Sequence, residues 1–200
     1  MSIWYHFAAH VVLPPVMQIW RLRSRGRERV PMHGPLIVAC NHSSYLDPVA
    51  LGVACPRALA FMAKAELFEI PILGPIITAV NAYPVDRRKS ATAAIKKSVE
   101  ILREGRAVGI FPQGTRVVEG EGQAKGGVAL LASLAGAPVL PAYVSGGAQA
   151  AQLHQIKVAF GTLLTLPAER KATREDLSNF TQAVMREITA LGREIESRAN

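Results

Sequence analysis

The chain has 200 residues, the length of one domain with room for a small appendage. Half of the residues are hydrophobic and 19% are charged, which excludes a disordered protein. The net charge of +8 indicates an anionic partner, and the 6% of aromatic residues leaves few rings for stacking on nucleic-acid bases. The mean hydropathy of +0.19 is high for a soluble enzyme and low for a multi-spanning protein, and favours a protein that sits on a membrane.

The N-terminal segment, residues 3–20, is apolar but is interrupted by Pro14-Pro15. A spanning helix needs about 20 apolar residues, and a signal peptide would have basic residues before the apolar part. A bent hairpin in one leaflet fits better, with the five arginines that follow it meeting anionic headgroups. An ordinary core helix is the alternative for the segment. Nucleic acid is the alternative partner for the arginines, although no nucleic-acid motif accompanies them.

The rest of the chain alternates short apolar runs with segments of helical periodicity. In chain order we expect strands over 36–40, 58–63, 107–111, 139–144 and 156–160, and helices over 49–54 (capped by Asp47), 91–104, 125–135 and from 173 to near the end. The apolar stretch 71–80 contains Pro and Gly and has no clear period. This alternation predicts an α/β fold with a mixed, mostly parallel central sheet flanked by helices, and functional residues in loops at strand ends.

The first candidate site is the segment Asn41-His42-Ser43-Ser44-Tyr45-Leu46-Asp47, directly after a predicted strand. The two side chains can meet if His42 lies in the loop and Asp47 caps the next helix. A carboxylate on one imidazole nitrogen fixes the tautomer and leaves the other nitrogen as a base for a substrate hydroxyl. On the residues alone, a structural role for His42 fits as well as a catalytic one.

The second candidate site is the segment Phe111-Pro112-Gln113-Gly114-Thr115-Arg116, which also follows a predicted strand. A glycine lets the backbone approach a phosphate, and an arginine binds its oxygens in a two-point contact. A plain surface turn is the alternative. Between the two segments, Tyr83-Pro84-Val85-Asp86-Arg87-Arg88 offers further cationic donors or forms a solvated loop.

These three segments, followed by Val139-Leu140-Pro141-Ala142, resemble the four motif blocks of the glycerolipid acyltransferases, and most of all the bacterial lysophosphatidate acyltransferases. The similarity covers roughly residues 30–165. By this resemblance His42 is the general base and Asp47 its orienting partner. The substrate-binding residues it implies are Lys64, Arg87, Gln113, Gly114, Thr115 and Arg116. The family usually has Glu where this chain has Gln113, which puts the identity of the acceptor in question.

The resemblance implies transfer of an acyl chain to the free hydroxyl of 1-acyl-glycerol 3-phosphate, giving phosphatidic acid. The donor would be acyl-CoA or acyl carrier protein, with no metal or other cofactor. We expect a membrane-associating segment over residues 1–30 and an acyltransferase domain over 31–200, held at the cytoplasmic face of the cell membrane as a monotopic or peripheral protein that binds anionic lipid and no nucleic acid. The alternatives are another acceptor (glycerol 3-phosphate, a lysophospholipid or a lyso-aminolipid), a thioester hydrolase, and a non-catalytic lipid-binding module.

Overall fold

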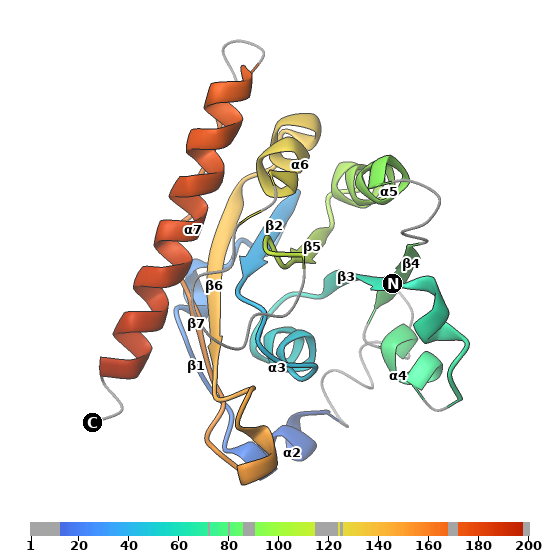
Figure 1. Ribbon diagram of the computed structural model, residues 1–200, viewed down its shortest axis with the longest axis vertical. Coiled ribbons are helices and arrows are strands. Elements are labelled where there is room, and N and C mark those ends of the chain that lie inside the picture. Colours follow the sequence, from blue (N-terminus) through green and yellow to red (C-terminus); the bar gives the residue numbers. More distant parts are fainter. Residues whose placement is uncertain are drawn as a thin grey trace.

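The computed structural model describes residues 13–71, 73–79, 81–85, 91–114, 124, 126–167 and 172–197. Its centre is a seven-stranded sheet in the order β1-β7-β6-β2-β5-β3-β4 (Figure 1). The strands are β1 Arg23–Arg25, β2 Leu36–Cys40, β3 Leu59–Lys64, β4 Ala82–Val85, β5 Ala107–Ile110, β6 Val139–Ser145 and β7 Lys157–Phe160. The α-helices are α2 Leu13–Met17, α3 Asp47–Ala54, α4 Leu73–Ala79, α5 Ala91–Arg103, α6 Gly127–Ala135 and α7 Arg174–Ser197. Single helical turns are η2 Gln18–Trp20, η3 Arg27–Arg29, η4 Ala65–Phe68 and η5 Ala150–Gln152.

The sheet is mixed and mostly parallel, as the sequence predicts. Among the strands that the structure describes, only β6 and β7 pair antiparallel, and every other neighbouring pair is parallel. The strand β2 pairs with β5 on one side and β6 on the other, so it lies in the middle of the sheet. The loop that follows Cys40 therefore opens at the centre of the edge where β2 to β6 all end, which we call the carboxyl edge. In open α/β sheets this edge is where ligands bind.

The two faces of the sheet are covered by different helices (Figure 1). Helices α5, α6 and α7 pack on the face that carries Ile37 and Val139, whereas α2 and α3 pack on the face that carries Val38 and Leu140. Every residue of β2 is buried, as expected for a central parallel strand that lies between two helical layers. The long helix α7 buries one stripe of apolar side chains along its length, and this stripe fixes how it lies against β6.

The sequence did not predict three of the described elements, which are β1, β4 and α4. Both strands lie at the edges of the sheet, where a strand has one ladder partner and its side chains need not be apolar. Accordingly β1 reads Arg-Ser-Arg, and β4 contains Pro84, a residue that sheets tolerate at edges. A further difference concerns α3, whose N-cap is Leu46, so Asp47 is the first residue of the helix and not its cap.

Part of the predicted membrane-associating segment belongs to this fold. Met17 is buried against the α3 face of the sheet, the indole of Trp20 donates to the carbonyl of Ala150 at 2.8 Å, and β1 pairs with β7. The sheet therefore begins before residue 31, the expected start of the domain. Residues 1–12, the first part of the predicted hairpin, lie outside the described residues. Among the helices that the structure describes, none has the length and apolar character needed to cross a bilayer.

Candidate active site

His42 and Asp47 meet at the centre of the carboxyl edge. The histidine lies in the loop after β2, Asp47 begins α3, and the distance from His42 Nδ1 to Asp47 Oδ2 is 3.1 Å. A carboxylate oxygen accepts hydrogen bonds, so Nδ1 carries the proton and Nε2 keeps its lone pair. The structure thus brings the two side chains together, and in this arrangement the pair can accept a proton at Nε2.

The carboxylate of Asp47 is held by the loop that it organises. Its Oδ2 also accepts the backbone N–H groups of Ser43, at 2.6 Å, and Ser44, at 2.7 Å. These charge-assisted bonds hold the loop that carries His42 in place. Asp47 therefore orders this loop and does not cap α3. The side chain of Asp47 is fully buried, and its Oδ1 has no hydrogen-bond partner in the part of the chain that the structure describes.

The loop after β5 holds His42 through two of its residues. Its imidazole stacks on Phe111, with ring centroids 4.1 Å apart and planes 21° apart, and Phe111 in turn lies beside Phe61. Its backbone N–H donates to Oε1 of Gln113 at 3.1 Å. Gln113 is itself almost completely buried, so its amide oxygen ties the loop after β5 to the loop after β2. This positioning role was not evident from the sequence, where Gln113 was assigned to substrate binding.

Asn41, the residue before the histidine, anchors the loop to β6. Its side-chain amide donates to the carbonyl of Val144 at 2.8 Å and accepts the N–H of the same residue at 2.7 Å. The side chain thereby extends the pairing of β2 with β6 by one step after the backbone has turned away. The sequence shows Asn41 directly before His42, but it does not indicate what Asn41 does. That role depends on the strand order, which places Val144 of β6 beside Asn41.

The structure brings together some of the predicted substrate-binding residues. Gly114 forms a tight turn after β5, with a φ of 71° that favours glycine and an N–H that donates to the carbonyl of Phe111. Lys64 is the last residue of β3 and is exposed at the same edge of the sheet. Arg87, Thr115 and Arg116 lie outside the described residues.

The cysteine nearest the site is not poised to act as a nucleophile. Cys40 is fully buried and its thiol donates to Oδ1 of Asn41. Burial, with a smaller contribution from the charge of Asp47, raises the pKa of Cys40 well above its ordinary value, so the reactive thiolate is suppressed. Within the described ranges, the structure holds no cluster of three or more His, Cys, Asp or Glu side chains that could bind a metal ion.

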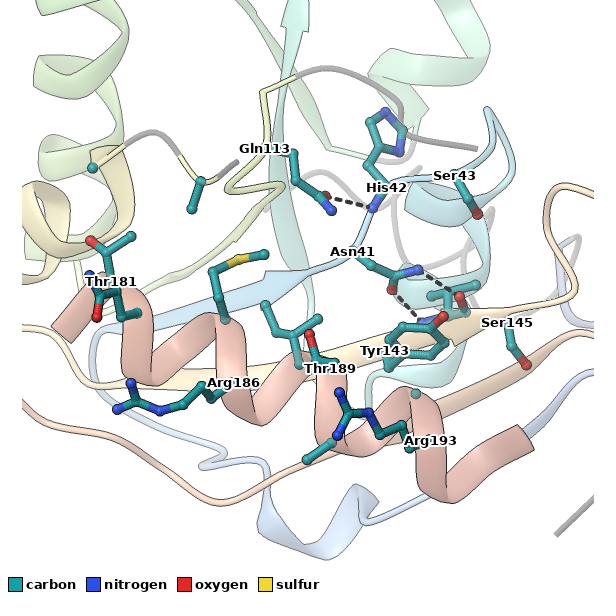
Figure 2. Close-up of a pocket in the computed structure, with 18 of the residues that line it drawn as sticks. Asn41, His42, Ser43, Gln113, Tyr143, Ser145, Thr181, Arg186, Thr189 and Arg193 are labelled. Carbon is teal, nitrogen blue, oxygen red and sulfur yellow. Dashed lines mark hydrogen bonds between the residues drawn. The ribbon is translucent and has the colours of Figure 1, made fainter. Parts of the chain in front are cut away.

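A groove of about 1420 Å³ runs from this loop along α7 (Figure 2). Asn41, His42 and Gln113 line one side of it, and side chains of α7 line the other. Tyr143 lies between them and donates its hydroxyl to Glu196 at 3.4 Å. Burial and then the nearby Glu196 raise the pKa of Tyr143 to about 12, so its hydroxyl stays protonated.

The geometry of this site limits the chemistry that it can support. An imidazole oriented by a buried carboxylate, beside an open groove at the carboxyl edge of an α/β sheet, is suited to deprotonating a substrate hydroxyl so that it can attack an electrophile. The model of the family described as Acyltransferase matches residues 21–145, which is more than half of the chain, and the chain belongs to that family.

Individual relatives are similar over most of the chain. A protein of Bacillus subtilis named 1-acyl-sn-glycerol-3-phosphate acyltransferase is 29% identical over 96% of this chain and 98% of its own. A protein of the same name from Streptococcus pneumoniae is 28% identical over 82% of this chain and 63% of its own. The crystal structure of the 1-acyl-sn-glycerophosphate acyltransferase PlsC from Thermotoga maritima shares the fold, with a TM-score of 0.67 and 22% identity over 92% of this chain and 82% of that one.

Proposed function

We propose that this acyltransferase transfers an acyl chain from an acyl thioester to the free hydroxyl of 1-acyl-glycerol 3-phosphate, giving phosphatidic acid. The observation that carries the proposal is the His42–Asp47 pair at 3.1 Å, held at the centre of the carboxyl edge. The names of the Bacillus and Streptococcus relatives support this choice of acceptor, and the first of them matches along nearly its whole length.

The reaction needs one base and no acyl-enzyme. Nε2 of His42 takes the proton of the glycerol hydroxyl as its oxygen attacks the thioester carbonyl carbon. The C–S bond then breaks, and the leaving sulfur receives the same proton from the imidazolium. Asp47 stabilises the imidazolium while it exists and keeps the ring in the required tautomer. The suppressed thiolate of Cys40 supports this direct transfer.

The acceptor phosphate would bind on the β5-β3-β4 side of His42. Lys64 ends β3, and Gly114 turns the chain directly after β5. The sequence continues from Gly114 into Thr115 and Arg116, and from β4 toward Arg87. Cations that follow neighbouring parallel strands come to one edge of a sheet, which suits a phosphate group.

The test is thiol release from an acyl thioester in the presence and absence of lysophosphatidate. Release that requires lysophosphatidate, with phosphatidic acid formed in equal amount, is the expected result. Release without an acceptor would instead identify a thioester hydrolase. Transfer to glycerol 3-phosphate, a lysophospholipid or a lyso-aminolipid, but not to lysophosphatidate, would replace the acceptor and keep the class of reaction. The His42→Ala variant, shown to be folded, is the control for enzymatic turnover.

We further propose that the carboxyl edge faces the cytoplasmic surface of the membrane. Val16 and Ile19 are exposed on α2 and η2, and Leu153 is exposed on the loop between β6 and β7 that lies beside them (Figure 1). Exposed apolar side chains next to a run of arginines are typical of an interfacial membrane contact.

The membrane proposal is tested by truncation. Because Met17 and β1 belong to the fold, only residues 1–12 should be removed. We expect the truncated protein to sediment less with vesicles of anionic phospholipid, and high salt to weaken binding of the full chain only in part, because apolar burial is not screened. Replacing both Val16 and Ile19 by Ser in the full chain should also weaken sedimentation. Equal sedimentation of all three proteins would refute the proposed membrane contact.

A further inference from the structure

The groove along α7 is larger than the predicted acceptor site requires. At about 1420 Å³ it exceeds the roughly 300–1,000 Å³ that is usual for small-molecule pockets. Its lining on α7 runs from Arg174 to Glu196, a length of about 33 Å at 1.5 Å per residue. A groove of this length suits an extended ligand that reaches from the helix to His42.

Unpaired cations distinguish this groove. Arg174, Arg186 and Arg193 line it, and Glu196 is the one acidic residue in the described lining. Arg186 and Arg193 are both exposed, and neither has an ion-pair partner in the described part of the chain. They are seven residues apart on α7, so they share one side of the helix at a spacing of about 10 Å along its axis. Figure 2 shows both extending from α7, with Asn41 and Gln113 across the groove.

The groove also lies on the other side of His42 from the predicted acceptor site. The predicted acceptor residues follow β3, β4 and β5, on one side of β2. Most of the groove's lining lies on β6, the loop after it and α7, on the opposite side of β2, although Gln113 and Leu130, which follow β5, also contribute to it. A transferase must bring both of its substrates to one base. In this sheet the acceptor can reach His42 from the β5 side of β2, and the donor can reach it from the β6 side.

We propose that the α7 groove binds the carrier arm of the acyl donor, and that Arg186 and Arg193 bind the phosphates of coenzyme A. This inference rests on the proposed function, which supplies the thioester. Coenzyme A is an extended thiol that carries a diphosphate and, further along, a ribose phosphate. Two arginines about 10 Å apart can contact two such separate anionic groups. The apolar side chains of Leu130 and Met185, between α6 and α7, would line the path of the uncharged part.

The test compares two donors: one carries the phosphorylated adenosine nucleotide of coenzyme A, and the other ends at pantetheine. We would measure KM for an acyl-CoA, and for the same acyl group on pantetheine, in wild type and in Arg186→Ala and Arg193→Ala variants. Each substitution should raise KM for acyl-CoA about tenfold or more, because a charge-assisted contact is lost. KM for acyl-pantetheine and for lysophosphatidate should stay within about twofold. Arg103→Ala, which removes an exposed arginine of α5 outside the groove, is the matched control.

A binding measurement separates this inference from the proposed function. Calorimetric titration with free coenzyme A needs no turnover, and its affinity should fall in both variants and with rising salt. An unchanged affinity, or an equal rise in KM for both donors, would overturn the inference whatever the acceptor proves to be. The same KM measurement is made with acyl-[acyl carrier protein] as the donor. An increase confined to that donor would show that the arginines bind an acidic protein surface, which also overturns the inference. An increase confined to lysophosphatidate would move the acceptor phosphate to this groove.

Discussion

The contact between Gly147 and Asp47 predicts the effect of adding a single methyl group. Gly147 is buried in the loop after β6, and a Cβ at this position would lie 2.5 Å from Oδ1 of Asp47 and 3.1 Å from Cβ of Ser44. Its φ is outside the left-handed region, so alanine is compatible with the backbone and only the space is lacking. Because Asp47 is fully buried, its carboxylate has little room to move without disturbing its partners.

The size of the effect follows from these distances. An ordinary contact between heavy atoms is about 3.5 Å, so Gly147→Ala must displace the carboxylate or the loop by about 1 Å. A displacement of that size would stretch the 3.1 Å contact between His42 and Asp47 beyond hydrogen-bond length. A misplacement of about 1 Å typically costs about 100-fold in rate, equivalent to about 2.7 kcal/mol in the activation barrier. We therefore expect kcat to fall about 100-fold, with KM for both substrates nearly unchanged.

The assay is steady-state thiol release with saturating acyl thioester and lysophosphatidate, with the folded fraction followed by circular dichroism. Gly52→Ala is the matched control, because it lies in the same helix as Asp47 and its added Cβ would make an ordinary 3.7 Å contact with Phe61. A folded Gly147→Ala protein with the kcat of wild type would show that the space beside Gly147 does not hold Asp47 in its catalytic position. Equal losses of kcat and folded fraction would assign Gly147 to stability alone.

Other substitutions test the remaining parts of the argument. His42→Ala should lower kcat about 100- to 10,000-fold in a folded protein, and Asp47→Asn should lower it less, because the orienting partner supplies only part of the base's contribution; wild-type turnover in either variant would exclude the pair as the base. Met17→Ala should lower the free energy of unfolding by about 2–5 kcal/mol in denaturant titrations, because the side chain is 1% exposed. An unchanged denaturation midpoint would show that Met17 does not contribute to the stability of the core. Cys40 and Cys55 should resist a thiol reagent at pH 8 until the protein unfolds, because both are buried and burial raises the pKa of Cys55 to about 11; rapid labelling of the native protein would contradict this.

The central elements could be predicted from the sequence because their residues carry the required pattern. The all-apolar run of β2 reports burial on both faces, and the repeating apolar positions of α7 report one buried stripe. Likewise His42 and Asp47 are close in sequence, so a single loop and the first turn of a helix are enough to bring them together. Local order of this kind is set by neighbouring residues alone.

Features that depend on strand order arise only when the whole chain folds. The strands β1 and β4 form because neighbouring strands offer them ladder partners, although their own sequences do not demand a sheet. The bond from His42 to Gln113 joins residues 71 apart in sequence, and the approach of Gly147 to Asp47 spans 100 positions. The arginines of α7 face a groove only because that helix packs along β6. Such contacts join residues that are far apart along the chain. The sequence around each residue therefore does not predict them.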